Sequence, residues 1–135
     1  MKILALDLGD KWVGSALSDA LSITCKPYKT TILENLTTFI TETLQEEPID
    51  TIIIGLPLTI KGTQSAQTKK VMLLKNSLEE KFKNITWILW DERYTSKRAN
   101  EIISKRKKSH KKNKQNDHVL AAAFILQSYL DSKSF

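Results

Sequence analysis

The sequence predicts a mixed α/β fold: a five-stranded sheet with three antiparallel strands and then parallel strands, flanked by helices. Two observations predict it. The first 33 residues hold three short segments rich in β-forming residues, separated by short turns. After them, segments with helical spacing of apolar residues alternate with short, continuous apolar runs. Because a strand, a helix and a second strand normally form a parallel crossover, the later strands should join the sheet in parallel.

The first three strands are expected at residues 3–8, 12–19 and 24–33. Residues 3–8 form a nearly continuous apolar run that ends in a glycine turn, which is typical of a strand buried on both faces. The second segment follows after only a few residues, so the first two strands should form a hairpin. The third contains Pro27, which favours an edge position because proline cannot donate to a strand ladder.

Helices and strands then alternate. Apolar residues recur at helical spacing between residues 33 and 45, and Pro48 prevents the helix from continuing. Residues 50–58 contain three consecutive isoleucines and then Gly-Leu-Pro, which indicates a buried strand that ends in a loop. A second amphipathic helix is expected over residues 64–82 and a further buried strand over residues 85–90.

Two more helices complete the prediction. Thr95 or Ser96 is suited to cap a third helix whose inner face holds Ala99 and the isoleucine pair at 102 and 103. A last helix is expected from after Asn116 to about residue 130. The predicted order is therefore β β β α β α β α α.

Composition indicates one globular domain, residues 1–135, with 41% hydrophobic and 27% charged residues. No run of about 18 apolar residues is present to cross a bilayer. The opening apolar run is too short for a signal peptide, so we expect a cytoplasmic protein. A single cysteine, Cys25, excludes an internal disulfide and a multi-thiolate metal site.

The positive charge is concentrated in one segment. Residues 97–114 contain nine lysines and arginines and one glutamate, whereas the rest of the chain is slightly acidic. Such a segment is typical of binding to nucleic-acid backbones, because the counterions around the phosphates are released when lysine and arginine contact them. A solvated loop that only aids solubility is the alternative. The candidate phosphate contacts in its densest part are Lys105, Arg106, Lys107, Lys108, Lys111, Lys112 and Lys114.

Carboxylates stand at the ends of predicted elements. Asp7 ends the first strand, Asp91 and Glu92 end the last strand, and Asp117 opens the final helix. Ligands of α/β sheets bind outside the carboxyl ends of strands, where such acids converge. Hydrolysis of a phosphodiester gives a reason to gather them, because carboxylates hold the metal ions that activate water and stabilise the leaving oxygen.

Each acid also has a structural interpretation. Asp7 is suited to cap the turn at Gly9. Asp117 is suited to the first turn of a helix, where its negative charge interacts favourably with the helix dipole. Asp91 and Glu92 are suited to pair with Arg93 or Lys97. Strand alternation places Asp91 and Glu92 on opposite faces, so one of them should be structural, and periodicity does not choose between them.

Helical spacing predicts which way Asp117 faces. It shares a helix face with Leu120, Ala121 and Phe124, so it should point toward the sheet. The two histidines, His110 and His118, lack zinc-ligand spacing and are expected to be solvated. A place for His118 in the outer shell of a metal, beside Asp117, is the alternative.

Four segments together resemble the YqgF/RuvX family of Holliday junction resolvase-like nucleases, also described as pre-16S rRNA nucleases. Residues 7–14, DLGDKWVG, resemble the family's D-x-G-x-K-R-[IV]-G, and residues 55–62 resemble its G-L-P-L-x-x-x-G loop. Residues 91–99 resemble D-E-R-[LFY]-[TS]-[TS]-x-x-A, and residues 117–130 resemble D-x-x-A-A-x-x-I-L-Q-x-[YF]-L. Their order and span make the resemblance specific.

The resemblance implies a ribonuclease H-like fold in which Asp7, Glu92 and Asp117 bind metal and carry catalysis. It thereby favours Glu92 over Asp91. It also implies maturation of the 5′ end of 16S ribosomal RNA, with cleavage of four-way DNA junctions as an alternative. The chain departs from the family at Trp12, where an arginine is usual, and no fourth carboxylate precedes Asp117 by one turn.

The leading functional hypothesis is a nuclease that uses Mg²⁺ or Mn²⁺ to hydrolyse structured nucleic acid. Lys11, Arg93 and the basic segment would position phosphates. A non-catalytic nucleic-acid-binding or ribosome-assembly factor is the alternative from another class. An ATP binder of the actin or sugar-kinase type is disfavoured, because such proteins close two domains around the nucleotide. The sequence does not predict an oligomeric state.

Overall fold

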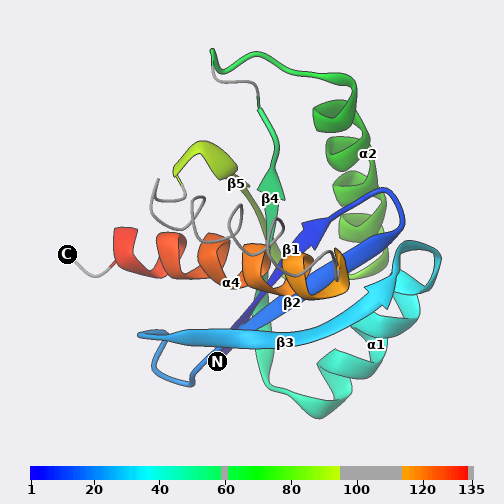
Figure 1. Cartoon of the computed structure of the whole chain (residues 1–135). Helices are drawn as coiled ribbons and strands as arrows, with labels where there is room; N and C mark the ends of the chain where they lie inside the picture. Colours follow the sequence, from blue (N-terminus) through cyan, green and yellow to red (C-terminus); the bar gives the residue numbers. More distant parts are fainter. Residues whose placement is uncertain (59–60, 95–113, 134–135) are drawn as a thin grey trace.

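The computed structural model of the chain describes residues 1–58, 61–94 and 114–133. The chain runs through these elements in order: β1 (Lys2–Leu8), β2 (Trp12–Ser18), β3 (Cys25–Ile32), the 3₁₀ turn η1 (Leu33–Asn35), α1 (Leu36–Glu46), β4 (Ile49–Leu56), α2 (Ala66–Lys81), β5 (Thr86–Asp91), the 3₁₀ turn η2 (Glu92–Tyr94) and α4 (Lys114–Ser132) (Figure 1). The helix expected from Thr95 or Ser96, and most of the basic segment, lie outside these residues.

The five strands form one sheet in the order β3-β2-β1-β4-β5. β1 pairs antiparallel with β2, and β2 pairs antiparallel with β3. β1 pairs in parallel with β4, and β4 in parallel with β5. The predicted mixed sheet is confirmed, and Pro27 lies on the edge strand β3 as expected. The carboxyl ends of β1, β4 and β5 therefore lie at the same end of the sheet.

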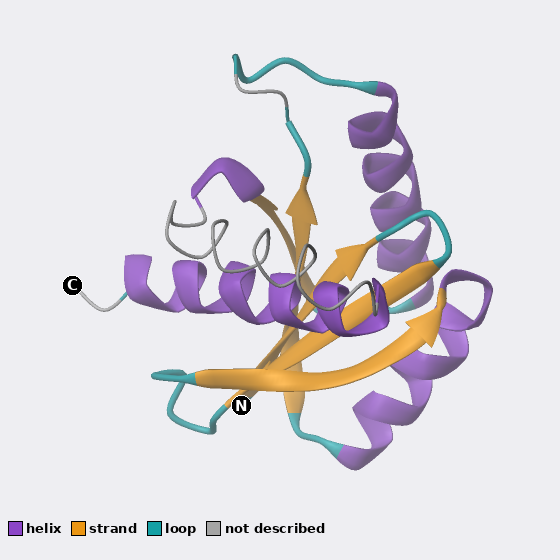
Figure 2. Ribbon diagram, viewed as in Figure 1, coloured by secondary structure: helices purple, strands orange, loops and turns teal. Residues whose placement is uncertain are grey.

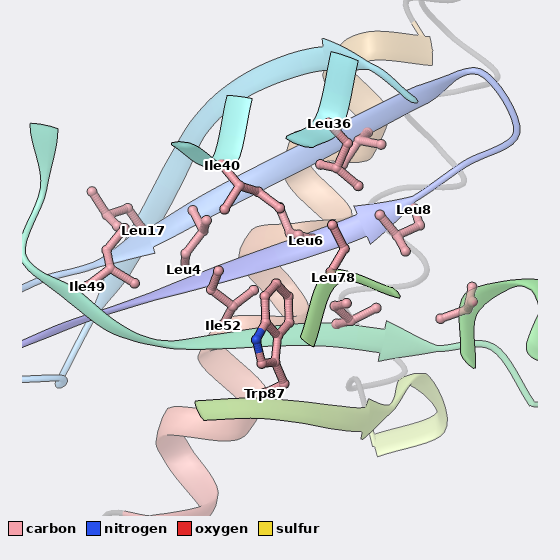
Figure 3. Packing of buried hydrophobic residues seen from close by; sticks show 13 residues of the cluster. Leu4, Leu6, Leu8, Leu17, Leu36, Ile40, Ile49, Ile52, Leu78 and Trp87 are labelled. Atoms are coloured by element: carbon pink, nitrogen blue, oxygen red, sulfur yellow. The ribbon is translucent and has the colours of Figure 1, made fainter. Parts of the chain in front are cut away.

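Helices cover both faces of the sheet (Figure 2). Leu4, Leu6 and Leu8 of β1 belong to one buried cluster, which also includes residues of α1 and α2, whereas Ala5 belongs to a second cluster with α4. Figure 3 shows the first cluster, where Leu36 and Ile40 of α1 and Leu78 of α2 cover the strand leucines. Each fully buried leucine contributes roughly 1.5–3 kcal/mol, so this alternation fixes the register of β1.

Helix α4 lies close to the sheet because the strands beneath it carry small residues. Ala5 and Ala16 are fully buried against it, and Gly14 leaves no room for a side chain between β2 and the helix. This close approach brings the first turn of α4 to the carboxyl end of β1.

The loop between β4 and α2 is tied to the start of the helix. Ser65 and Thr68 form a capping box, each side chain bonding to the other's backbone N–H, and the Thr68 hydroxyl also donates to the carbonyl of Pro57. The helix thus begins two residues later than the sequence predicts. Within the described part of the chain, no helix is both long and apolar enough to span a bilayer.

Candidate active site

Asp7 is the penultimate residue of β1 and pairs with Gly14 of β2, and its side chain is 15% exposed. The position two residues earlier, Ala5, packs against α4, so alternation places Asp7 on the same face as that helix. The following turn is closed by the backbone, because Gly9 N–H donates to the Trp12 carbonyl at 2.9 Å. Asp7 is therefore not needed as a turn cap, and its carboxylate is directed to other partners.

Glu92 is the first residue of η2, directly after β5. Its carboxylate packs over Gly55 of β4, where a Cβ atom would lie 2.6 Å from Oε1. Burial, followed by the charge of Asp7 and a hydrogen bond between the two carboxyl groups, raises the pKa of Glu92 to about 7. Carboxyl groups from the ends of β1 and β5, with β4 between these strands in the sheet, thus meet, and near neutral pH Glu92 is partly protonated.

Asp91, the last residue of β5, has a different partner. It accepts hydrogen bonds from Arg93 Nη2 at 2.6 Å, from Arg93 Nε at 3.0 Å and from the Arg93 backbone N–H at 2.9 Å. These bonds lower the pKa of Asp91. The guanidinium of Arg93 lies against Gly62, which has a φ of +85°. The structure therefore separates the two adjacent acids: Asp91 is ion-paired and Glu92 meets Asp7.

Asp117 is 9% exposed in the first turn of α4, as expected for an inward-facing acid. The expected face was partly wrong, however. The fully buried stripe of α4 consists of Ala122, Ile125, Leu126 and Leu130, whereas Leu120, Ala121 and Phe124 are only partly buried. His118 lies four and seven residues before Ala122 and Ile125, so it belongs to the stripe facing the sheet.

His118 is not solvated as the sequence suggested. Its Nδ1 lies 2.6 Å from Asp7 Oδ2, and its side chain is 27% exposed. The sequence signal that predicts this position is the helical spacing of His118 to the buried apolar residues of α4. Its distance in sequence from other residues that bind metals does not predict it.

The predicted phosphate contacts are only partly described. Lys11 is exposed in the turn after β1, with its ammonium 5.7 Å from the centre of the Trp12 ring. Arg93 is held by Asp91, with its side chain 39% exposed. Lys114 is the first residue of α4, and the structure describes its backbone but not its side chain. The remaining predicted contacts, Lys105, Arg106, Lys107, Lys108, Lys111 and Lys112, lie outside the described residues.

The chemistry of the donors at Asp7 and Glu92 suits a hard divalent cation. Such ions prefer carboxylate oxygens, and a cation between the two carboxylates would offset the burial and the repulsion by Asp7 that raise the pKa of Glu92. Among residues 1–58, 61–94 and 114–133, no group of three or more His, Cys, Asp or Glu side chains is assembled as a metal site. The pair is thus the part of the expected acidic set that the structure brings together.

This pairing predicts a pH-dependent stability in the absence of metal. The pKa of Glu92 is about 7 in the folded state, against 4.5 as its ordinary value. The folded protein therefore binds more protons between these values, and its free energy of unfolding should fall as pH rises from 4.5 to 7. Urea unfolding in EDTA at several pH values measures this slope.

Glu92→Gln should flatten that slope, whereas Glu34→Gln, which removes a glutamate from an exposed position, should leave it unchanged. An equal slope in wild type and Glu92→Gln would contradict the raised pKa of Glu92.

Comparison with known proteins identifies the family. Residues 1–132 match the family model described as "RuvX: Holliday junction resolvase". The chain belongs to the RuvX family. Relatives of this member include a protein of Thermoanaerobacter pseudethanolicus, 43% identical over 98% of both chains, and one of Syntrophus aciditrophicus, 38% identical over 99% of this chain and 91% of the other. Both relatives carry the name "Putative pre-16S rRNA nuclease".

Solved structures show that this RuvX family member has the fold of junction resolvases. The Fowlpox virus resolvase, solved with its substrate Holliday junction DNA, matches with a TM-score of 0.58 and 19% identity over 100% of both chains. RuvC of T. thermophilus, solved in complex with a Holliday junction substrate, matches with a TM-score of 0.62 and 10% identity over 98% of this chain and 96% of the other. The ribonuclease H-like fold expected from the sequence is confirmed.

Proposed function

We propose that the protein hydrolyses phosphodiester bonds of structured nucleic acid with the aid of a divalent cation, Mg²⁺ or Mn²⁺, held by Asp7 and Glu92. As a member of the RuvX resolvase family, the protein is a nuclease. The observation that supports the metal proposal is the contact between the Asp7 and Glu92 carboxyl groups at the end of the sheet. Asp117, buried in the first turn of α4, is proposed as the third acid of the set.

The residues have separate tasks in this mechanism. Asp7 and Glu92 would hold the cation through their carboxylate oxygens, and Gly55 leaves the Glu92 side chain room to lie on β4. A divalent cation, when bound, supplies an activated water and stabilises the charge on the leaving oxygen. Lys11 and the basic residues 105–114 would contact phosphates of the substrate backbone. Arg93, fixed by Asp91, anchors the Gly62 loop beside this site.

The proposed substrate is the 5′ extension of precursor 16S ribosomal RNA, in the cytoplasm. The names of the bacterial relatives at 38% and 43% identity support it. A four-way DNA junction is the competing substrate, suggested by the family description and by what the structural neighbours bind.

A cleavage assay tests the proposal and separates these substrates. Purified protein is incubated with Mn²⁺ and either an end-labelled RNA that spans the 5′ boundary of 16S RNA or a labelled four-way DNA junction. We expect metal-dependent cleavage of the RNA at the mature 5′ boundary and no cleavage in EDTA. Cleavage of the junction alone would replace the RNA assignment. If neither is cut while both bind, the protein is a non-catalytic binding factor and the proposal fails.

Trp12 gives a prediction about substrate binding. The family's usual arginine would place a cation at the start of β2, next to Lys11. Trp12→Arg should therefore tighten nucleic-acid binding by roughly 2- to 10-fold at low salt and steepen the salt dependence by about one phosphate contact. Fluorescence anisotropy at several salt concentrations measures both, with Trp12→Gln as the uncharged control. Equal affinities for the two variants would exclude a phosphate near residue 12.

A further inference from the structure

His118 connects helix α4 to the carboxylate at the end of β1. Its Nδ1 lies 2.6 Å from Asp7 Oδ2, a short distance typical of a charge-assisted hydrogen bond. An ionised carboxylate only accepts, so the imidazole donates through Nδ1–H. The two residues are separated by 111 positions in the sequence, and the bond therefore fixes the first turn of α4 against β1.

Two glycines make room for this histidine. A Cβ at Gly9 would lie 2.7 Å from His118 Cε1 and 2.8 Å from Nε2, so the imidazole rests directly on the turn after β1. A Cβ at Gly14 would lie 2.1 Å from the backbone carbonyl carbon of His118. A side chain at residue 9 would thus occupy the space of the His118 ring, and a side chain at residue 14 would occupy the space of its backbone. This leaves the imidazole little freedom to turn away from Asp7.

The Asp7 carboxylate is consequently held by two groups from different elements, His118 of α4 and Glu92 of η2. A carboxylate that binds a cation must present its oxygens in a fixed direction, and groups that hydrogen-bond to such ligands orient them. A hydrogen bond to Oδ2 fixes the rotation of the carboxylate plane about the Cβ–Cγ bond.

We infer that His118 is a positioning residue, whose Nδ1–H holds the Asp7 carboxylate in the orientation that cation binding and hydrolysis require. This inference rests on the proposed function, since it assigns a role only if Asp7 works in cleavage. Neither the family description nor the names of the relatives assign a role to this histidine.

The position of the donor atom distinguishes this role from simple packing. In asparagine the amide nitrogen is attached to Cγ, as Nδ1 is in histidine, so His118→Asn keeps a donor facing Asp7. In glutamine the nitrogen lies one bond farther out, so His118→Gln has the same functional group in the wrong place. A packing role would depend on volume and would favour Gln over Asn, because the glutamine side chain is closer in size to that of histidine.

The experiment measures single-turnover cleavage and the Mn²⁺ concentration for half-maximal rate in wild type and in His118→Ala, His118→Gln and His118→Asn. We expect Ala and Gln to lose roughly 10- to 100-fold in rate or Mn²⁺ affinity. Asn should recover to within about 3-fold of wild type, with the Kd for nucleic acid unchanged in all three. Thermal melts identify any variant that does not fold, and the comparison of Asn with Gln stands without the alanine variant.

The controls separate failure of this inference from failure of the proposed function. If Asp7→Asn cuts as fast as wild type, the proposed function fails and the role of His118 fails with it. If Asp7→Asn is inactive while Asn and Gln at position 118 behave alike, or alanine matches wild type, only the inference about His118 is overturned.

Discussion

Asp7→Asn is expected to reduce the cleavage rate by about 10³-fold or more, equivalent to roughly 4 kcal/mol of lost transition-state stabilisation. The substitution keeps the shape of the side chain and removes its charge. It therefore weakens the cation site, because one of the two carboxylate oxygens is replaced by an amide NH2 and only one oxygen remains to serve both a cation and His118. Single-turnover cleavage of labelled RNA in Mn²⁺ measures the loss.

Asp10→Asn is the matched control, because it removes the same charge from an exposed position in the neighbouring turn. It should cleave within about 2-fold of wild type, and both variants should bind nucleic acid, since sequence-independent affinity comes mainly from cationic residues. An equal loss in both variants would indicate that net charge, rather than a site at Asp7, governs cleavage.

Gly14→Ala is expected to cause a large loss of stability. An added Cβ would lie 2.1 Å from the carbonyl carbon of His118, 2.3 Å from its oxygen and 2.4 Å from the nitrogen of Val119. These are backbone atoms of α4 and do not move by a change of rotamer, so the helix must shift from β2. Overpacking of this kind typically costs 1–3 kcal/mol and occasionally more, and we expect about 3 kcal/mol. Urea unfolding measures the change.

Gly55→Ala is the informative comparison. Its Cβ would meet Glu92 Oε1 and Ile125 Cδ1, each at 2.6 Å, and both are ends of side chains. Because these side chains can rotate, Gly55→Ala should lose less stability than Gly14→Ala but should displace Glu92 and weaken Mn²⁺-dependent cleavage. If Gly55→Ala is the less stable variant, the close approach of α4 to β2 is not the limiting contact.

The order of elements was predictable because each depends on a local pattern. Alternation and continuous apolar runs predicted the strands, and Pro27 predicted the edge strand. Boundaries were less predictable: the strand expected at residues 85–90 runs from Thr86 to Asp91, and the helix expected after Asn116 begins at Lys114. Whether the last residue of a helix or strand is hydrogen-bonded depends on the residues near it in space, and the spacing of apolar residues in the sequence gives no information about these.

The site was predictable only in part. That Asp7 ends a buried strand follows from sequence, but the choice between Asp91 and Glu92 required the resemblance to a family. The structure supplies the physical reason: β5 ends at Asp91, so Glu92 lies in a 3₁₀ turn and strand alternation no longer determines its direction. The contact of His118 with Asp7 was not predicted, because the helix face was assigned from Asp117 and the outer-shell alternative placed His118 beside Asp117.

The central claim is that Asp7 and Glu92 together hold the cation used in hydrolysis. The most direct test is the cleavage rate against Mn²⁺ concentration for wild type and Glu92→Gln. Wild type should be inactive in EDTA and reach a plateau with added Mn²⁺, and Glu92→Gln should need at least about 10-fold more Mn²⁺ for half the plateau rate. Cleavage that persists in EDTA, or identical Mn²⁺ curves for the two proteins, would contradict the claim.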